Sequence, residues 1–370
     1  MEWLEKKFQR ILAPADVTID GDKPWDIRVL NKRLYRRVLL AGSLGLGEAY
    51  MDGWWTAQDL SGFFARVIAA GLARKVGKVR ILLGIAQAVF RNLQSRSRAF
   101  VVGERHYDIG NDLYEKMLDA RMVYTCGYWK NARTLDEAQE AKLDLVCRKI
   151  GLKPGSRVLD VGCGWGSFAQ FAAERYGAHV VGITVSKEQA ALARERTKGL
   201  PVTIEVCDYR DITGTFDAIV SLGMFEHVGY KNYRVYMETM NAALKEDGLF
   251  LLHTIGGNRS VYTTEPWIEK YIFPGGMIPS IRQVGDAIED LFVMEDWHNF
   301  GSDYDATLMA WFSNFDRNWP LLKEKYGERF YRMWTYYLMV SAAVFRSRKN
   351  QLWQIVLSKR GISGGYESVR

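Results

Sequence analysis

The 370-residue sequence predicts an α/β protein: a Rossmann-like sheet with helices on both faces, preceded by a small N-terminal α+β domain. Two observations predict this fold class. An apolar strand, 157–161, runs directly into a turn with glycine at alternate positions: Gly162, Gly164 and Gly166. The segments that follow alternate between apolar strands and amphipathic helices, a pattern typical of parallel sheets with right-handed crossovers.

The expected elements of this sheet follow in order along the chain. They are strand 157–161, helix 167–176, strand 179–183, helix 186–197, strands 202–206 and 216–220, helix 231–244 and strand 248–254. The remainder, 266–370, is rich in aromatic residues at helical spacing. We therefore expect one large domain over 106–370.

The N-terminal region, 1–84, has a different character and is expected to form a lipid-associated or membrane-associated domain. Its strand-like pieces are 17–19 and 26–29, its helix-like pieces are 32–40 and 59–70, and 45–55 is expected to be an ordered turn that packs its tryptophans. Residues 85–105 are expected to form a basic linker to the larger domain.

Composition narrows the class of protein further. With 48% hydrophobic and 25% charged residues the chain is globular. The four cysteines form no Cys-x-x-Cys pair, which disfavours a disulfide framework and a metal site. No apolar run reaches the roughly 18 residues of a membrane-spanning helix, and the N-terminus carries charges where a signal peptide is apolar. We expect a cytoplasmic protein.

The net charge of +7 indicates an anionic partner. No acidic residue lies between Asp59 and Glu104, and apolar residues are interleaved with the basic ones in this stretch. Its basic residues are Arg66, Arg74, Lys75, Lys78, Arg80, Arg91, Arg96 and Arg98. This pattern favours peripheral attachment to an anionic membrane surface, here the inner face of the membrane. The alternatives are a solvated linker helix and, least favoured, nucleic-acid binding.

The glycine-rich turn is where a cofactor is expected. Glycine lets the turn adopt positive φ and lets a ligand approach where a Cβ would collide, and the next helix would point its positive end at that ligand. Glycines that serve packing alone are the alternative. The second strand ends without the acid that dinucleotide-binding folds often place there for a ribose, which disfavours an NAD dehydrogenase.

Several blocks of sequence together resemble the cyclopropane-fatty-acyl-phospholipid synthases, in the class I S-adenosylmethionine (SAM)-dependent methyltransferase superfamily. These blocks are 106–114 (HYDIGNDLY), 124–129 (YTCGYW), 159–168 (LDVGCGWGSF), 182–189 (GITVSKEQ), 225–229 (FEHVG) and 271–276 (YIFPGG). The N-terminal region resembles the extra domain of the bacterial phospholipid enzymes, which their mycolic acid relatives lack. The resemblance therefore implies a phospholipid substrate, and it also implies a homodimer.

The implied reaction moves a methylene unit from SAM to the cis double bond of an acyl chain, through a carbocation that loses a proton as the ring closes. The resemblance implies bicarbonate as the base, held by residues that match Cys126, Glu226, His253, the backbone of Ile255, and Tyr304. Aromatic faces can shield a cation. The candidates for this role are Tyr124, Tyr128, Tyr271, Phe273 and Tyr304.

The residues themselves give independent support for part of this site. Glu226 follows strand 216–220 and His253 lies near the end of strand 248–254. These strands are neighbours in the expected sheet, so both side chains can converge at its carboxyl edge. Ile255 lies two residues beyond His253 and would face the same side. The ordinary alternatives are a core histidine, a helix-capping acid, a small buried Cys126 and a core Tyr304.

The cofactor residues that the resemblance implies lie at successive strand ends. Gly162, Gly164 and Gly166 would approach the methionine and ribose, Thr184 and Gln189 the ribose, and Tyr209 and Arg210 the adenine; Asp160 would reach the ammonium group, and Tyr124 and Thr125 complete the set. Ser341 departs from the pattern, since some family members carry a cysteine there that was once assigned as catalytic. His106, His179, His227 and His298 are expected to be structural or surface residues.

Three alternative functions remain. A soluble enzyme that methylates nitrogen is disfavoured, since no Asn/Asp-Pro-Pro-Tyr signature follows the fourth strand; methylation of oxygen in a soluble substrate stays open. A lipid-binding protein without activity would have lost the glycines or Glu226. Methylation of an unsaturated lipid without ring closure uses the same scaffold and stays open.

Overall fold

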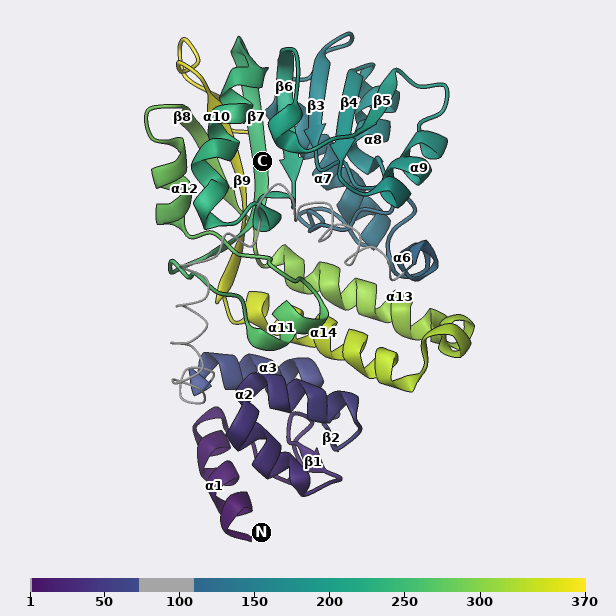
Figure 1. The fold of residues 1–370 in the computed structure, drawn as a ribbon, viewed down its shortest axis with the longest axis vertical. Helices are drawn as coiled ribbons and strands as arrows, with labels where there is room; N and C mark the ends of the chain where they lie inside the picture. Colours follow the sequence, from purple (N-terminus) through teal and green to yellow (C-terminus); the bar gives the residue numbers. More distant parts are fainter. Residues whose placement is uncertain (1, 73–109) are drawn as a thin grey trace. The chain divides into compact units, whose positions relative to one another are not determined.

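The computed structural model describes residues 2–72 and 110–370 (Figure 1). The chain divides into two compact units. Within the described residues the first comprises 2–72, 263–274 and 304–350, and the second comprises 110–262, 275–303 and 351–370. The expected boundaries at 84 and 105, most of the basic stretch and the start of the 106–114 block lie outside the described residues, so the three-part division stays a prediction.

The second unit contains the predicted sheet. Within the described residues its strands are β3 (Arg157–Val161), β4 (His179–Thr184), β5 (Val202–Val206), β6 (Phe216–Leu222), β7 (Leu244–Gly257), β8 (Val293–Asn299) and β9 (Asn350–Ser358). Their order is β5-β4-β3-β6-β7-β9-β8. The first five strands in this order pair in parallel, and β8 is antiparallel to β9. The predicted Rossmann-like α/β class is confirmed.

The helices of this unit connect the strands in the expected order. They are α6 (Asn111–Met117), α7 (Leu135–Lys149), α8 (Ser167–Tyr176), α9 (Lys187–Arg196), α10 (Tyr233–Ala243) and α12 (Ile281–Ile288), with short 3-10 turns at Tyr209–Asp211, Phe225–His227 and Tyr230–Asn232. Capping fixes where several begin. The Thr134 side chain and Glu137 form a capping box at the start of α7, and Ser186 caps α9 through the backbone N–H of Gln189.

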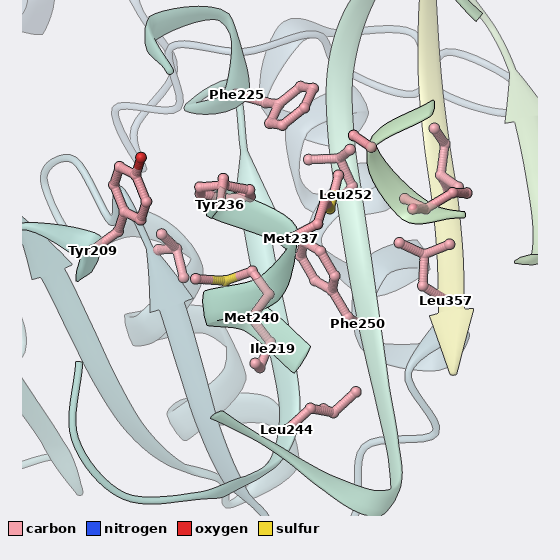
Figure 2. Packing of buried hydrophobic residues seen from close by; sticks show 14 of the residues in the cluster. Tyr209, Ile219, Phe225, Tyr236, Met237, Met240, Leu244, Phe250, Leu252 and Leu357 are labelled. Carbon is pink, nitrogen blue, oxygen red and sulfur yellow. The ribbon is translucent and has the colours of Figure 1, made fainter. Parts of the chain in front are cut away.

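Alternating strand residues divide the core of this unit between the two faces of the sheet. Leu159, Ile219 and Phe250 pack with α10 and α12 in the cluster drawn in Figure 2. Val158 and Leu251 pack on the opposite face with α7 and α8. Because side chains alternate along a strand, the continuation of β7 places His253 on the α7 face.

The first unit is helical, with a small antiparallel pair of strands. Its elements are α1 (Glu2–Leu12), a 3-10 turn (Ala13–Ala15), β1 (Arg28–Val29), α2 (Arg33–Met51), β2 (Trp55–Thr56), α3 (Leu60–Ala69), α11 (Pro266–Tyr271), α13 (Asp303–Tyr326) and α14 (Glu328–Arg346). Helix α14 packs against α2 and α3. Their contact is aromatic: the ring centre of Tyr336 lies 4.9 Å from that of Phe64 in α3 and 5.7 Å from that of Tyr50 in α2.

The expected turn at 45–55 is wrong over most of its length. Helix α2 breaks at Gly42, where φ is +61°, but it then resumes and ends only at Met51. Its glycines serve helix packing: a Cβ on Gly47 would overlap the indole ring of Trp267. The tryptophan packing itself is present, because Trp55 is fully buried against Tyr50 and Phe63. Among the described residues no helix is long and apolar enough to cross a bilayer.

Gly47→Ala is expected to destabilise the first unit, because the added methyl group has no room beside Trp267. Overpacking of this kind costs about 1–3 kcal/mol. The matched control is Gly285→Ala in α12, where a Cβ meets no atom within 4 Å and helix propensity favours alanine. Chemical denaturation should show a loss for the first variant and none for the second. Equal stability of the two variants would contradict this packing argument.

Candidate active site

The glycines of the turn after β3 have different surroundings: two pack closely against other residues, and the third borders open space. Gly162, Gly164 and Gly166 all have positive φ, +80°, +54° and +79°. A Cβ on Gly162 would lie 2.8 Å from the Met224 side chain, and one on Gly166 would lie 3.2 Å from the Cβ of Ala193. A Cβ on Gly164 would meet none of the described atoms within 4 Å. Gly164 is therefore the position where a ligand can lie against bare backbone.

Asp160 lies just before this turn and is 2% exposed. Its Oδ2 atom is buried and has no hydrogen-bond partner within the described part of the chain. Burial raises the pKa of the Asp160 carboxyl to about 7, and the charge of Lys142 acts in the opposite direction. A buried acceptor of this kind is suited to a cationic group such as an ammonium.

The other predicted cofactor residues lie at the ends of β4 and β5. Thr184 and Gln189 are buried, and the Thr184 hydroxyl donates to Gln189 Oε1 at 3.0 Å. Arg210 forms an ion pair with Asp208 at 3.0 Å, and its guanidinium lies 4.5 Å from the centre of the Tyr209 ring. The structure therefore places Thr184 beside Gln189 and Tyr209 beside Arg210.

The segment 123–126 is held from behind by helix α7. Lys142 Nζ donates to Thr125 Oγ1 at 2.8 Å, and Gln139 Nε2 donates to the Thr125 carbonyl at 2.8 Å. A Cβ on Gly223, just after β6, would lie 2.7 Å from Thr125 Cγ2. Tyr124 packs edge-on to Tyr114, with ring centres 5.1 Å apart. This segment is thus fixed beside the carboxyl end of β6.

Glu226 lies next to the end of β7, the strand that carries His253. Leu222 at the end of β6 is paired with His253 of β7, and the backbone N–H of Ile255 donates to Glu226 Oε1 at 2.7 Å. Sequence reasoning did not foresee that Glu226 itself would engage this N–H. Among the described residues, Glu226 Oε2 and His253 Nε2 are both buried and have no hydrogen-bond partner.

Burial sets the protonation state of Glu226 and of His253. It raises the pKa of Glu226 to about 7, although the hydrogen bond from Ile255 lowers it in part. Burial, together with the charges of Lys142 and Lys149, holds the pKa of His253 well below its usual range, so the imidazole is neutral. The partly protonated carboxyl and the neutral ring can both donate a hydrogen bond to an anion.

The remaining predicted residues divide between the two units. Cys126 is fully buried in the second unit, and its thiol lies 3.1 Å from the Gly127 carbonyl oxygen. Tyr128, in the same unit, packs against Phe300, which also contacts His253. The first unit holds Tyr271, Phe273, Tyr304 and Ser341. There Tyr304 stacks on Phe345 with ring centres 4.5 Å apart.

Comparison with known proteins decides the family. A family model described as mycolic acid cyclopropane synthetase matches residues 94–355, more than half of the chain. The chain belongs to this family. It is 53% identical over 361 residues to the cyclopropane-fatty-acyl-phospholipid synthase of Escherichia coli K12, covering 97% of this chain and 94% of that protein. The family resemblance drawn from the sequence blocks is confirmed.

Solved structures of the mycolic acid cyclopropane synthetase family share the fold. Cyclopropane synthase MmaA2 from Mycobacterium tuberculosis is 30% identical with a TM-score of 0.67, covering 73% of this chain and all of that one. The mycolic acid cyclopropane synthase CmaA1 in complex with SAH and CTAB is 32% identical with a TM-score of 0.66, covering 70% of this chain and 98% of that one. The class I SAM methyltransferase fold is confirmed.

Sequence reasoning missed two polar residues that contact the site. Gln354 of β9 is fully buried, and its Nε2 lies 3.4 Å from His253 Nδ1. Lys142 lies on the apolar face of α7, in line with Leu135, Ala138 and Val146. A lysine at helical spacing from several apolar residues is the signal that could have identified it. No comparable signal marks Gln354, since its contact depends on the pairing of distant strands.

Proposed function

We propose that this chain is a SAM-dependent cyclopropane synthase that acts on the cis double bond of an unsaturated acyl chain in a phospholipid. The observation that carries the proposal is the contact of Glu226 with the end of β7, at a buried place where Glu226 Oε2 and His253 Nε2 have no hydrogen-bond partner among the residues that the structure describes. The family's cyclopropane chemistry needs such a place, since a base must work beside a carbocation where water is excluded.

The chain's own residues fit SAM. When bound, SAM supplies an electrophilic methyl carbon on a sulfonium. Gly164 leaves room at the turn, Asp160 offers a buried acceptor for the ammonium, and Thr184 with Gln189 offers polar groups at the second strand end, where a ribose is expected. Tyr209 and Arg210 are proposed to border the adenine, and Tyr124 and Thr125 to complete the site.

The residues around Glu226 also fit bicarbonate. When bound, bicarbonate supplies the base that accepts the proton lost as the ring closes. The protonated form of Glu226 and the neutral ring of His253 would donate to this anion, with Cys126 beside them and the Ile255 backbone holding Glu226 in place. Tyr304 is proposed to join this set. Tyr124, Tyr128, Tyr271 and Phe273 are the proposed aromatic shields of the cation.

Release of S-adenosylhomocysteine (SAH) from SAM by the purified protein tests the proposed substrate class. We expect release with vesicles of phospholipid that carries cis-unsaturated chains, and only background release with vesicles of the matching saturated phospholipid. The reason is that methyl transfer in this proposal needs the electrons of a double bond. Equal release with the two vesicle types would contradict the proposal and would favour methylation of nitrogen or oxygen.

We further propose that the protein is a homodimer that attaches peripherally to the cytoplasmic face of an anionic membrane. Basic residues near such a surface contribute about 1 kcal/mol each, and the sequence between Arg66 and Arg98 is basic and free of acids. Most of this stretch lies outside the described residues, so the support is its sequence alone. The dimer is supported by the family resemblance.

Replacement of Arg74, Lys75, Lys78 and Arg80 by glutamine is expected to weaken binding to anionic vesicles. Activity on vesicles should fall much more than activity on detergent-dispersed phospholipid, because the site residues are unchanged. Vesicle co-sedimentation at low and high salt is the measurement. Attachment of the variant as tight as that of the parent at both salt levels would show that the stretch is a solvated linker.

A further inference from the structure

Lys142 is a charged residue in the interior of the second unit. It is 0% exposed, and its Nζ donates to Thr125 Oγ1 at 2.8 Å. A lysine is almost never fully buried unless its charge has a partner. Burial lowers the pKa of Lys142 to about 8, and the negative charges of Asp119, Cys126 and Asp160 act in the opposite direction.

The two carboxylates differ in what else they contact. Asp119 accepts backbone N–H groups at both oxygens, from Val123 at 2.8 Å and Arg121 at 2.9 Å. Asp160 Oδ2 is buried and has no hydrogen-bond partner in 2–72 and 110–370, and the charge of Lys142 favours the ionised form of Asp160. Of the two carboxylates, Asp160 therefore depends more on Lys142 for its negative charge.

We infer that Lys142 is a positioning residue for the cofactor site: its ammonium group anchors the 123–126 segment through Thr125 and keeps the Asp160 carboxylate ionised for the ammonium group of SAM. This inference rests on the proposed function only in the identity of the ligand. It assigns a role to a residue of α7 that touches neither the cofactor nor the reacting atoms.

The charged neighbours define the expected pH dependence. Lys142 acts on Asp119, Cys126, Asp160 and His253, and Asp160 acts in turn on Cys163 and Tyr236. The protonated Asp160 carboxyl cannot pair with an ammonium group, so cofactor affinity is lost as the pH falls through its pKa. Removal of the Lys142 charge raises that pKa, because the charge lowers it in the parent. The loss of affinity then begins at a higher pH.

The test is the dissociation constant of SAH, measured by calorimetry across pH in the parent and in Lys142→Met. A pKa shift of one unit changes the ionised fraction tenfold below the pKa, so we expect binding weakened about tenfold or more near pH 6.5 and by less than about threefold near pH 8.5. Lys142→Gln retains a donor for Thr125 without the charge. Its affinity for SAH should likewise approach that of the parent as the pH rises. This second variant carries the test where the methionine variant does not fold.

Lys149→Met is the matched control, because Lys149 is the other fully buried lysine of α7 but pairs with Asp296 at 3.3 Å. Its effect on SAH binding should be independent of pH. Asp160→Asn should bind SAH weakly, and its affinity should no longer depend steeply on pH. A Lys142 variant that folds and binds like the parent, or that is weakened equally at all pH values, would overturn the inference. Failure of the parent to bind SAH would instead contradict the proposed cofactor.

Discussion

Gly164→Val is expected to abolish measurable SAH binding in a protein that remains folded. The residue has φ of +54°, which a β-branched side chain strongly disfavours, and its Cβ would enter space where no atom of residues 2–72 and 110–370 lies within 4 Å. In our account that space is filled by the cofactor. Calorimetry with SAH measures the effect directly.

The matched control for Gly164 is Gly151→Val, at the end of α7. Gly151 has φ of +59°, and a Cβ there also meets nothing within 4 Å. Both variants should lose similar stability through backbone strain, but only the first should lose SAH binding. Parent-like affinity in a folded Gly164→Val protein would show that the cofactor turn is misplaced.

Glu226→Gln is expected to lower kcat by about a hundredfold or more, because it alters the group proposed to hold the bicarbonate base, and a positioned base typically contributes that much. The glutamine carbonyl can still accept the Ile255 N–H, so the local fold is retained while the group at Oε2 changes. SAH affinity should stay within a few-fold of the parent value. His253→Ala should have the same pattern. Single-turnover and equilibrium binding measurements separate the two quantities.

Glu238→Gln on the exposed face of α10 is the control for this substitution, since it removes only a surface ion pair with Arg234. It should leave kcat unchanged. Removal of carbonate from the buffer should lower the parent's activity, and added bicarbonate should restore it. A Glu226→Gln protein that loses affinity by the same factor as rate would place Glu226 in cofactor binding. Activity indifferent to carbonate would remove the proposed base.

The parts of the fold that local patterns determine could be predicted from the sequence. Strand 157–161 and helix 167–176 match β3 and α8 at both ends, because apolar runs and glycines mark their limits. The approach of Glu226 to the end of β7 followed from the adjacency of two parallel strands.

The features that sequence reasoning missed depend on contacts between distant segments. The glycines at 45 and 47 suggested a turn, but in α2 the second of them makes room for Trp267, more than 200 residues away. The engagement of Ile255 N–H by Glu226 depends on the local path of the chain after β6. The partners of the buried Lys142, Thr125 and Asp160, come from other segments of the chain and could not be predicted from the sequence around the lysine.

The product formed from SAM with a trideuterated methyl group tests the central claim most directly. Closure of a cyclopropane ring removes one deuteron from the transferred methyl group and consumes the double bond. We therefore expect mass spectrometry to find a phospholipid acyl chain with two deuterium atoms, and NMR to find ring protons in place of the alkene signals. A product that keeps its carbon–carbon double bond, with two or three deuterium atoms, would contradict the account.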